Sequence, residues 1–450
     1  MHKKQRIHFI GIGGIGVSAL AQYYLGRGHR ITGSDLTASE ITASLKKLGA
    51  KIHIGNPRPE LITSRVGLVV YSPAVPPTNP EFQKAYIMKA SQPNFRLLSY
   101  PEALGELTKT HYTIAVSGTH GKSTTTSMIG LLLWKAGLDP TVIVGTRLKE
   151  FGDTNCRVGK SRYLVIEADE HFASFLNYWP KIIVLTTIEA DHLDYYKNLS
   201  NVIRGFKKYI SHLPKDGFLV ANQDDKNIQK ILYKIQNTKY KIQYYSLSQK
   251  EAEKLRNLLK IPGEHNVSNA LAALAVARIL GIPDAKSFKA LGEYHGSWRR
   301  FEVFQLFRPK RYTLISDYGH HPTEIKVTVE AARSQWPEKT LWLVFQPHQY
   351  ARTFYLFKDF VKVLAKAPVD KLIITDIYDV AGREDDAIRK KVSSEQLVEA
   401  IQKIENSKVL YLPTLKEVEA YLKKNLKGGE VVMVMGAGDI YNLTLRLCLH

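Results

Sequence analysis

The stretch AVSGTHGKSTTT, residues 115–126, contains a short version of a phosphate-binding loop. The common nucleoside-triphosphatase pattern is G-x-x-x-x-G-K-[ST], whereas here Gly118 and Gly121 frame the shorter string G-T-H-G-K-S. A strand-like run precedes the loop and a helical pattern follows it. Backbone N–H groups of the loop are then expected to face phosphate oxygens, with Lys122 reaching the β and γ phosphates and Ser123 offering a hydroxyl to Mg²⁺. Chance Gly-Lys-Ser strings are common, so the loop alone leaves both an ATP site and a coincidence open.

A second glycine-rich loop, GIGGIG at residues 11–16, follows the strand-like run RIHFI and opens a helical stretch. Such glycines allow a tight turn and close backbone approach, while the helix N-terminus faces a pyrophosphate. The pattern is typical of NAD-dependent enzymes, but it physically requires only a diphosphate and a ribose, which a UDP-sugar also provides. A plain glycine-rich turn is the alternative. The candidate sugar-nucleotide residues are Gly11, Gly13, Gly14, Gly16, Asp35 and Ser72, the last two at the ends of later strand-like runs.

Acidic residues and a histidine follow two further strand-like runs. EADEHFASF places Glu167, Asp169 and Glu170 after YLVIE, and IEADHLDYY places His192 after IIVLTTI. Open α/β sheets bind ligands at the carboxyl ends of their strands, and carboxylates there suit Mg²⁺. A solvated acidic loop and a structural histidine are the alternatives that these residues leave open.

The remaining candidates lie in the second half of the chain. His265 and Asn266 precede an alanine-rich helix predicted over 267–281, and Asn266 either caps that helix or contacts a nucleotide base. Arg299 and Arg300 follow a Gly-Ser-Trp turn and are placed to clamp a γ-phosphate when domains close. The strings DYGHHPTE and FQPHQYART add Asp317, His320, His321, His348 and Arg352, each just after a strand-like run.

Strand and helix patterns that alternate along the chain position these candidates. The spacing of RIHFI, HRITGSD and GLVVYS predicts a parallel, doubly wound sheet, and similar patterns recur in the middle and last thirds. We expect an α/β protein of three domains, at residues 1–107, 108–297 and 298–450. No apolar run reaches the roughly 18 residues that a membrane span requires.

The overall composition is that of a globular protein with a basic surface. The net charge is +21, yet the lysines and arginines are scattered, which favours attraction of anionic small molecules over nucleic-acid binding. The only cysteines, Cys156 and Cys448, have no metal-ligand spacing and fit a reducing cytoplasm. The N-terminus imitates a signal peptide, but its glycines are better explained by the loop at 11–16, so we expect a cytoplasmic protein.

These pieces, in this order, resemble the Mur ligase family, the ATP-dependent amide-bond-forming enzymes of peptidoglycan assembly, over nearly the whole chain. In that family the phosphate loop is itself the short form G-T-x-G-K-[ST]. HFIGIGG, GSD, EADE, IEADH, RRFE, DYGHHPTE and FQPH are most similar to the members that join L-alanine to UDP-N-acetylmuramate. The resemblance implies an N-terminal Rossmann-like domain for the UDP-sugar, a central P-loop ATPase-like domain with a parallel or mixed sheet, and a C-terminal Rossmann-like domain for the amino acid. It also implies a role in cell-wall biogenesis, and hence in cell shape and division.

The resemblance implies roles for single residues. The catalytic set is Lys122, Glu167, His192 and Arg300, and the set that serves Mg²⁺ is Ser123, Glu167 and His192. The ATP-binding set is Gly118, Thr119, His120, Gly121, Lys122, Ser123, Thr124, Asn266, Arg300 and Asp317, with Asn266 meeting the adenine. One departure is the pair His171-Phe172, where a small polar residue followed by Asp is usual, so no role is carried over beyond Glu167 in that string.

The implied reaction forms an acyl phosphate on the lactyl carboxylate, which the amine of alanine then attacks. The carboxylate of alanine needs a fixed cation, and His348 with Arg352 is our candidate pair for it. The alternative ligase is the recycling enzyme that adds a tripeptide to the same sugar nucleotide. An NAD-dependent oxidoreductase leaves Lys122, Glu167 and His192 without a role, and a nucleic-acid-binding ATPase lacks a basic stripe. The oligomeric state is not predicted.

Overall fold

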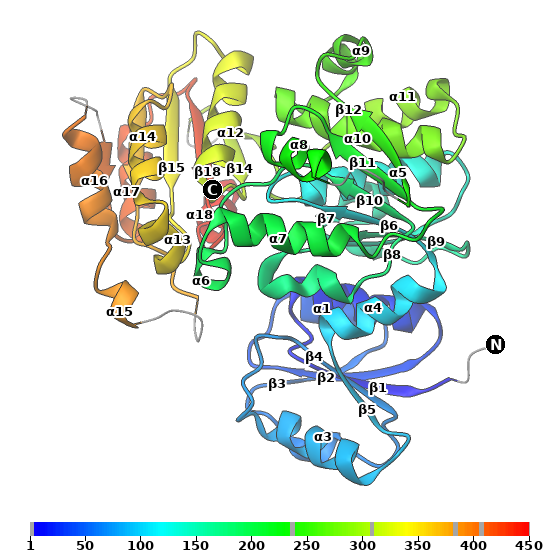
Figure 1. Cartoon of the computed structure of the whole chain (residues 1–450). Coiled ribbons are helices and arrows are strands. Elements are labelled where there is room, and N and C mark those ends of the chain that lie inside the picture. Colours follow the sequence, from blue (N-terminus) through cyan, green and yellow to red (C-terminus); the bar gives the residue numbers. More distant parts are fainter. Residues whose placement is uncertain (1–3, 235–238, 307–309, 381–385, 405–408, 450) are drawn as a thin grey trace. The chain divides into compact units, whose positions relative to one another are not determined.

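The computed structural model describes residues 4–234, 239–306, 310–380, 386–404 and 409–449 (Figure 1). Its strands form three sheets, of five, seven and six strands. The contacts group the chain into two compact units. The first holds Met1–Ile188, Ile203–Ser246 and Asn269–Leu291, and the second holds Glu189–Val202, Leu247–Ser268 and Gly292–His450. The first two sheets lie in the first unit and the third sheet in the second, which confirms the predicted α/β class with N-terminal, central and C-terminal sheets. The exact boundaries 107/108 and 297/298 stay predictions.

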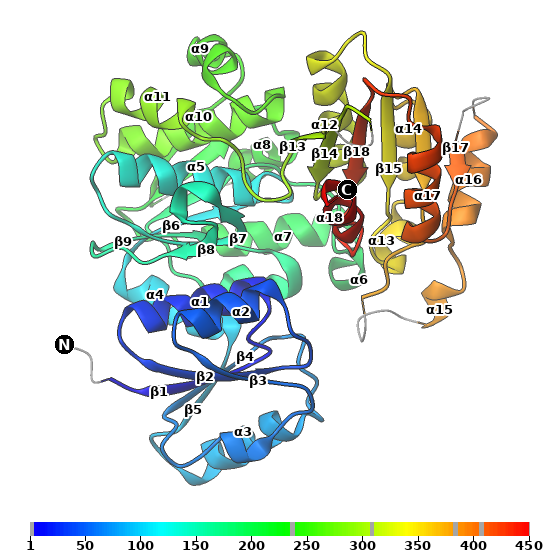
Figure 2. The same cartoon turned by 180° about the vertical axis from the view of Figure 1, so that it is seen from behind.

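The five-stranded sheet is wholly parallel, as predicted from its strand spacing. Its order is β3-β2-β1-β4-β5. The strands are β1 (Arg6–Ile10), β2 (Arg30–Asp35), β3 (Lys51–Ile54), β4 (Leu68–Tyr71) and β5 (Arg96–Ser99). The helices are α1 (Ile15–Gly26), α2 (Glu40–Lys47), α3 (Pro80–Ser91) and α4 (Tyr100–Thr110), with the short helix η1 (Pro59–Leu61). Figures 1 and 2 show α1 and α4 on one face of this sheet and α3 on the other.

The seven-stranded sheet is parallel except at one edge. Its order is β12-β11-β10-β6-β9-β7-β8, and only β8 runs antiparallel to its neighbour β7. The strands are β6 (Tyr112–Ser117), β7 (Thr141–Leu148), β8 (Thr154–Arg157), β9 (Tyr163–Glu167), β10 (Ile182–Leu185), β11 (Phe218–Asn222) and β12 (Lys241–Tyr245). The helices of this part of the chain are α5 (Lys122–Lys135), η2 (Lys149–Phe151), η3 (His171–Asn177), α6 (Leu193–Tyr196), α7 (Leu199–Ile210), α8 (Lys226–Tyr233), α9 (Glu251–Leu258), α10 (Glu264–Ile279) and α11 (Asp284–Gly292). Helix α1 packs against β7 and β8, so the glycine-rich loop before α1 borders the central sheet.

The six-stranded sheet has the order β13-β14-β18-β15-β16-β17, with β13 antiparallel at the edge. The strands are β13 (Glu302–Leu306), β14 (Tyr312–Asp317), β15 (Leu341–Phe345), β16 (Lys371–Ile374), β17 (Val409–Tyr411) and β18 (Val431–Met435). The helices are α12 (Pro322–Gln335), α13 (Tyr350–Tyr355), α14 (Phe357–Ala365), α15 (Asp386–Arg389), α16 (Ser394–Gln402), α17 (Leu415–Asn425) and α18 (Tyr441–Cys448). Because β13 runs antiparallel to β14, this sheet is mixed and not wholly parallel.

Side chains of the buried strands point alternately to the two faces of the C-terminal sheet, and this explains how the sheet packs helices on both faces. Leu343 and Phe345 belong to a core cluster with α12, α14 and α16, whereas Trp342 and Val344 belong to a second cluster with α17 and α18. Successive side chains of a strand point to opposite faces, so an unbroken apolar run such as LWLVF covers both. In the part of the chain that the structure describes, no helix is long and apolar enough to cross a membrane.

Candidate functional site

The phosphate-type loop connects β6 to α5 in the first unit. Gly118 has φ +141°, and a Cβ there would lie 2.1 Å from Oγ1 of Thr186. Gly121 has φ +80°, and a Cβ there would lie 2.5 Å from Oδ1 of Asn269. Both positions therefore require glycine for backbone conformation and for space. The predicted strand–loop–helix context is present.

The amides of this loop are only partly directed as the sequence suggested. The N–H of Thr119 donates to the carbonyl of Thr187 at 2.8 Å, and the N–H of His120 donates to Oγ1 of the same residue at 3.0 Å. Those two amides therefore tie the loop to the segment after β10. The N-terminal amides of α5, which begins at Lys122, are the part of the loop best placed to meet an anion.

The ammonium of Lys122 is held by Glu170, which the sequence offered only as one of three carboxylates suited to Mg²⁺. Its Nζ lies 2.9 Å from Oε2 and 3.2 Å from Oε1 of Glu170, and 3.9 Å from Oδ1 of Asp169. It also donates to the carbonyl of Gly118 at 2.7 Å. Burial lowers the pKa of Lys122, but the carboxylates of Glu170 and Asp169 outweigh burial and raise that pKa above its usual value. Lys122 is therefore a fixed positive charge at the start of α5.

The candidate metal ligands of the first unit are Ser123 and Glu167. Ser123 is 7% exposed, in the first turn of α5, and Glu167 ends β9, the strand beside β6. Oε2 of Glu167 also accepts a hydrogen bond from the N–H of Gly145. A hydroxyl and a carboxylate at the carboxyl ends of neighbouring parallel strands are the oxygen donors that suit Mg²⁺. His192 belongs to the second unit, so the structure does not test the set of three as a whole.

The GIGGIG loop is held by Asp35 from the end of β2. The N–H of Gly13 donates to Oδ2 of Asp35 at 2.7 Å, and a Cβ at Gly13 would lie 2.8 Å from that same oxygen. Gly11 has φ +74° and lies against the side chain of Ser72, so that four of the predicted sugar-nucleotide residues make these contacts. Gly14 is the N-cap of α1. Asp35 thus shapes the loop, and its contact with a ribose stays a prediction.

Tyr100 is a neighbour of this loop that sequence reasoning missed. A Cβ at Gly16 would lie 2.8 Å from Cζ of Tyr100, the first residue of α4. Burial raises the pKa of the Tyr100 phenol, as do the nearby carboxylates of Glu167 and Asp169. Tyr100 therefore lies between the GIGGIG loop and the acidic residues after β9. Nothing in the string SYPEA indicates this position.

In the second unit, Asp317 at the end of β14 holds the residue before β13 and the turn after β14. Its Oδ2 accepts from the N–H of Phe301 at 2.8 Å and its Oδ1 from the N–H of Gly319 at 2.7 Å. Burial raises its pKa to about 6 although Arg300 and both amides favour the charged form. The guanidinium of Arg300 lies over the ring of Tyr318, 4.9 Å from its centroid. Asp317 and Arg300 are thus neighbours, as expected for residues of one nucleotide site, and that role stays a prediction.

Helix α10 begins three residues earlier than predicted, so His265 and Asn266 lie inside the helix and not before it. Both lie in the first turn of α10, which starts at Glu264, and Gly263 with φ +100° precedes it. The positive φ at Gly263 turns the chain into the helix, so Asn266 is not the cap. Its Nδ2 donates to the carbonyl of Pro262 at 2.6 Å. The cap reading was wrong, and contact with a base stays a prediction.

The predicted amino-acid pair, His348 and Arg352, lies at the start of α13. Nε of Arg352 donates to Oδ1 of Asp191 at 3.1 Å, and Nη2 lies 3.4 Å from Oδ2. Nη1 of Arg352 contacts Oε1 of Gln349 at 3.2 Å and Nδ1 of His348 at 3.3 Å. Burial lowers the pKa of His348 to about 2, and His320 and Arg352 add to the effect, so His348 is neutral and Arg352 is the cation of the pair. A substrate carboxylate would have to share Arg352 with Asp191.

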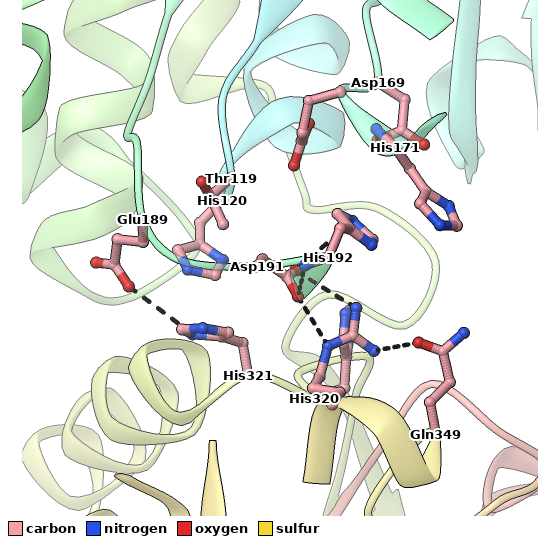
Figure 3. Close-up of polar contacts among 12 residues, drawn as sticks. Thr119, His120, Asp169, His171, Glu189, Asp191, His192, His320, His321 and Gln349 are labelled. Atoms are coloured by element: carbon pink, nitrogen blue, oxygen red, sulfur yellow. Dashed lines mark hydrogen bonds and ion pairs between the residues drawn. The ribbon is translucent and has the colours of Figure 1, made fainter. Parts of the chain in front are cut away.

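Asp191 and its neighbours border a small pocket in the second unit. Its lining residues are Asp191, His192, Leu193, Asp194, Gln349, Arg352, Tyr355 and Leu356. Figure 3 shows His192 beside Asp191, and it shows Glu189 facing His321. Sequence reasoning singled out His192 and Arg352 but missed Asp191, which joins them.

The three sheets, the short phosphate loop and the second glycine-rich loop define a multidomain α/β protein with two loops of the kind that binds phosphate groups. Models of three protein families match successive parts of the chain: the Mur ligase family catalytic domain at residues 6–112, the Mur ligase middle domain at 116–277, and the Mur ligase glutamate ligase domain at 299–438. The chain therefore belongs to the Mur ligase family, as the similarity of two curated relatives also shows.

Those relatives are both named UDP-N-acetylmuramate–L-alanine ligase. The protein from Caldanaerobacter subterraneus subsp. tengcongensis is 40% identical over 98% of this chain and 97% of its own length. The protein from Acetivibrio thermocellus is 39% identical over 98% of this chain and 95% of its own length.

Two solved structures share the fold. The UDP-N-acetylmuramate–alanine ligase of Thermotoga maritima is 25% identical with a TM-score of 0.77, and the alignment covers 98% of each chain. A murein peptide ligase from Psychrobacter arcticus is 22% identical with a TM-score of 0.70 over 98% of each chain, which is a similarity of fold alone.

Proposed function

We propose that this protein is an ATP-dependent ligase that joins L-alanine to the lactyl carboxylate of UDP-N-acetylmuramate during peptidoglycan precursor synthesis. The observation that carries the proposal is the phosphate loop with Lys122 held by Glu170, in a chain about 40% identical to ligases of that name over nearly its whole length. We infer that the enzyme works in the cytoplasm, because the proposed reaction consumes ATP.

The chemistry needs a place where a carboxylate and the γ-phosphate of ATP meet. An oxygen of the lactyl carboxylate attacks the γ-phosphorus and ADP leaves, which gives an acyl phosphate. Lys122 supplies a permanent positive charge for the transferring phosphoryl group, and Arg300, which lies near Asp317, supplies another. The amine of alanine then attacks the acyl carbon, and phosphate leaves with the oxygen that had belonged to the carboxylate.

We infer a Mg²⁺ requirement from the donor set. Ser123 and Glu167 are oxygen donors at the carboxyl ends of parallel strands, and His192 would contact the metal directly or through a water. Mg²⁺ bound there would offset the negative charge of the phosphates. The sugar nucleotide would bind at Gly11 to Gly16, where the N-terminus of α1 faces its pyrophosphate.

The recycling ligase that adds a tripeptide is the second candidate. The fold similarity to a murein peptide ligase keeps that candidate in view, but at 22% identity it concerns the fold alone. The relatives near 40% identity, in contrast, carry the alanine ligase name.

Isotope transfer tests the proposed chemistry. UDP-N-acetylmuramate labelled with ¹⁸O in the lactyl carboxylate should pass one labelled oxygen to each phosphate released. Unlabelled phosphate from a turning-over enzyme would exclude the acyl phosphate. Analysis of the same samples for the amide product shows whether phosphate release accompanies ligation of the sugar nucleotide.

A further inference from the structure

A buried ion pair ties the segment that carries His192 to the C-terminal part of the second unit. Arg352 contacts both carboxylate oxygens of Asp191, at 3.1 Å and 3.4 Å. The two residues are 8% and 7% exposed. A guanidinium that meets a carboxylate at two points fixes orientation as well as distance, and burial strengthens the attraction. The pair therefore holds Asp191 in one place relative to α13.

Asp191 also makes a hydrogen bond with the next residue, His192. Its Oδ1, the atom that accepts from Nε of Arg352, also accepts from the N–H of His192 at 2.7 Å. His192 has φ +51°, in the left-handed region that a non-glycine residue adopts only when its surroundings hold it there. Leu193, which follows, packs against the core cluster of the C-terminal sheet. The backbone at His192 is thus set by Asp191 and Leu193 together.

A second set of contacts holds the beginning of the same segment. Oε2 of Glu189 accepts from Oγ1 of Thr323 at 2.6 Å and lies 3.8 Å from Nδ1 of His321 (Figure 3). Nε2 of His321 lies 3.4 Å from the carbonyl of Ala190. His321 is the N-cap of α12 and Thr323 lies in its first turn. Residues 189–192 are therefore tied to both α12 and α13.

We propose that Asp191 is a positioning residue that links Arg352 to His192, so that the amino-acid-binding part of the chain sets the orientation of a metal ligand. The inference rests on the proposed function, because that proposal assigns His192 to the metal and Arg352 to the amino acid. Groups behind a metal ligand fix its orientation, and their loss typically lowers metal affinity about 10- to 100-fold. A substitution of Arg352 should therefore weaken metal binding measurably, even though Arg352 is not a metal ligand.

A double-mutant cycle tests this link. Asp191→Asn, Arg352→Lys and the double variant are compared with the parent protein for Mn²⁺ affinity by electron paramagnetic resonance in the presence of ADP, and for the Mg²⁺ and alanine concentrations that half-saturate phosphate release. Each single variant should bind Mn²⁺ about 10- to 100-fold more weakly, and the double variant should be no worse than the weaker single one. Arg333→Lys is the matched control, because Arg333 pairs with Asp370 at 2.7 Å on the exposed side of the same domain.

Two outcomes would contradict the link between Arg352 and His192. Additive losses, or an Arg352→Lys variant that needs more alanine but binds Mn²⁺ like the parent, would overturn the link. If Asp191→Asn fails to fold, Asp191→Glu keeps a carboxylate at a different reach and completes the cycle. An enzyme that releases no phosphate with any amine would refute the proposed function, whereas the Mn²⁺ cycle would still be readable and would judge the link by itself.

Discussion

The Nζ atom of Lys122 lies 2.9 Å from Oε2 of Glu170, a carboxylate that is only 2% exposed. Two loops that follow adjacent strands, β6 and β9, bring these groups together. Glu170 and Asp169 raise the pKa of this ammonium above its usual value despite burial, so Lys122 is charged at neutral pH. Binding of ATP then requires the phosphates to share Lys122 with Glu170.

Replacement of Lys122 by alanine should abolish ATP turnover and spare the sugar-nucleotide site. Loss of a charge aimed at a transferring phosphoryl group costs about 100-fold or more in rate. We expect phosphate release to fall by at least that factor, while calorimetry shows unchanged UDP-N-acetylmuramate binding, because the GIGGIG loop lies on another sheet. Lys135→Ala, at the exposed end of the same helix, is the control. A Lys122→Ala variant with near-normal turnover would show that this loop is not the ATP site.

Replacement of Gly13 should weaken sugar-nucleotide binding and spare ATP binding, the opposite of the effect expected at Lys122. A Cβ at Gly13 would lie 2.8 Å from Oδ2 of Asp35, so Gly13→Val must distort the loop that Asp35 holds. UDP-N-acetylmuramate should bind at least about 10-fold more weakly, a loss of about 1.4 kcal/mol, with ATP binding unchanged. Gly67→Val is the matched control in the same domain, since a Cβ at Gly67 meets no atom within 4 Å. Equal effects of the two substitutions on sugar-nucleotide binding would remove the GIGGIG loop from the site.

Two substitutions test the metal assignment. Glu167→Gln weakens a carboxylate donor, and His192→Ala removes an imidazole, so each should lower activity in a way that raised Mg²⁺ partly restores. The measurement is a Mg²⁺ titration of phosphate release at saturating substrates. Parallel titration curves that differ only in height would mean that both residues are structural.

The buried carboxyl of Asp317 should make stability depend on pH in an identifiable direction. Its pKa rises from 3.8 to about 6 on folding. Between those values the folded protein keeps a proton that the unfolded chain has lost, so the contribution of Asp317 to stability is present below pH 3.8 and is lost as the pH rises through 6. Asp317→Asn should therefore gain stability relative to the parent between pH 4 and pH 7, by up to about 3 kcal/mol. Urea unfolding at several pH values measures this difference, and a constant difference would contradict the raised pKa.

Local patterns predicted the binding loops and most of the buried strands. GTHGKS and GIGGIG are recognisable as short glycine patterns, and the runs that became β1, β9 and β10 are apolar enough to indicate strands by themselves. The short edge strands β8 and β13 were not predicted, because β8 has only four residues and β13 contains no fully buried residue.

Partners distant in sequence were beyond such reasoning. Glu170 meets Lys122 across 48 positions, and Arg352 meets Asp191 across 161. No spacing rule connects residues so far apart. Glu170 reaches Lys122 because β9 lies beside β6, whereas Asp191 reaches Arg352 because residues 189–202 pack with the C-terminal part of the second unit. Glu170 stood within a recognised string and Asp191 beside His192, so the sequence indicated both regions but neither ion pair.

Phosphate release with ATP, UDP-N-acetylmuramate and one amine at a time tests the central claim most directly. We predict that phosphate appears only when all three substrates are present, that free L-alanine supports it, and that one amide is formed for each phosphate. Omission of any one substrate should abolish it. An enzyme that ignores free alanine but turns over with a tripeptide that begins in alanine would contradict this account in favour of the recycling ligase.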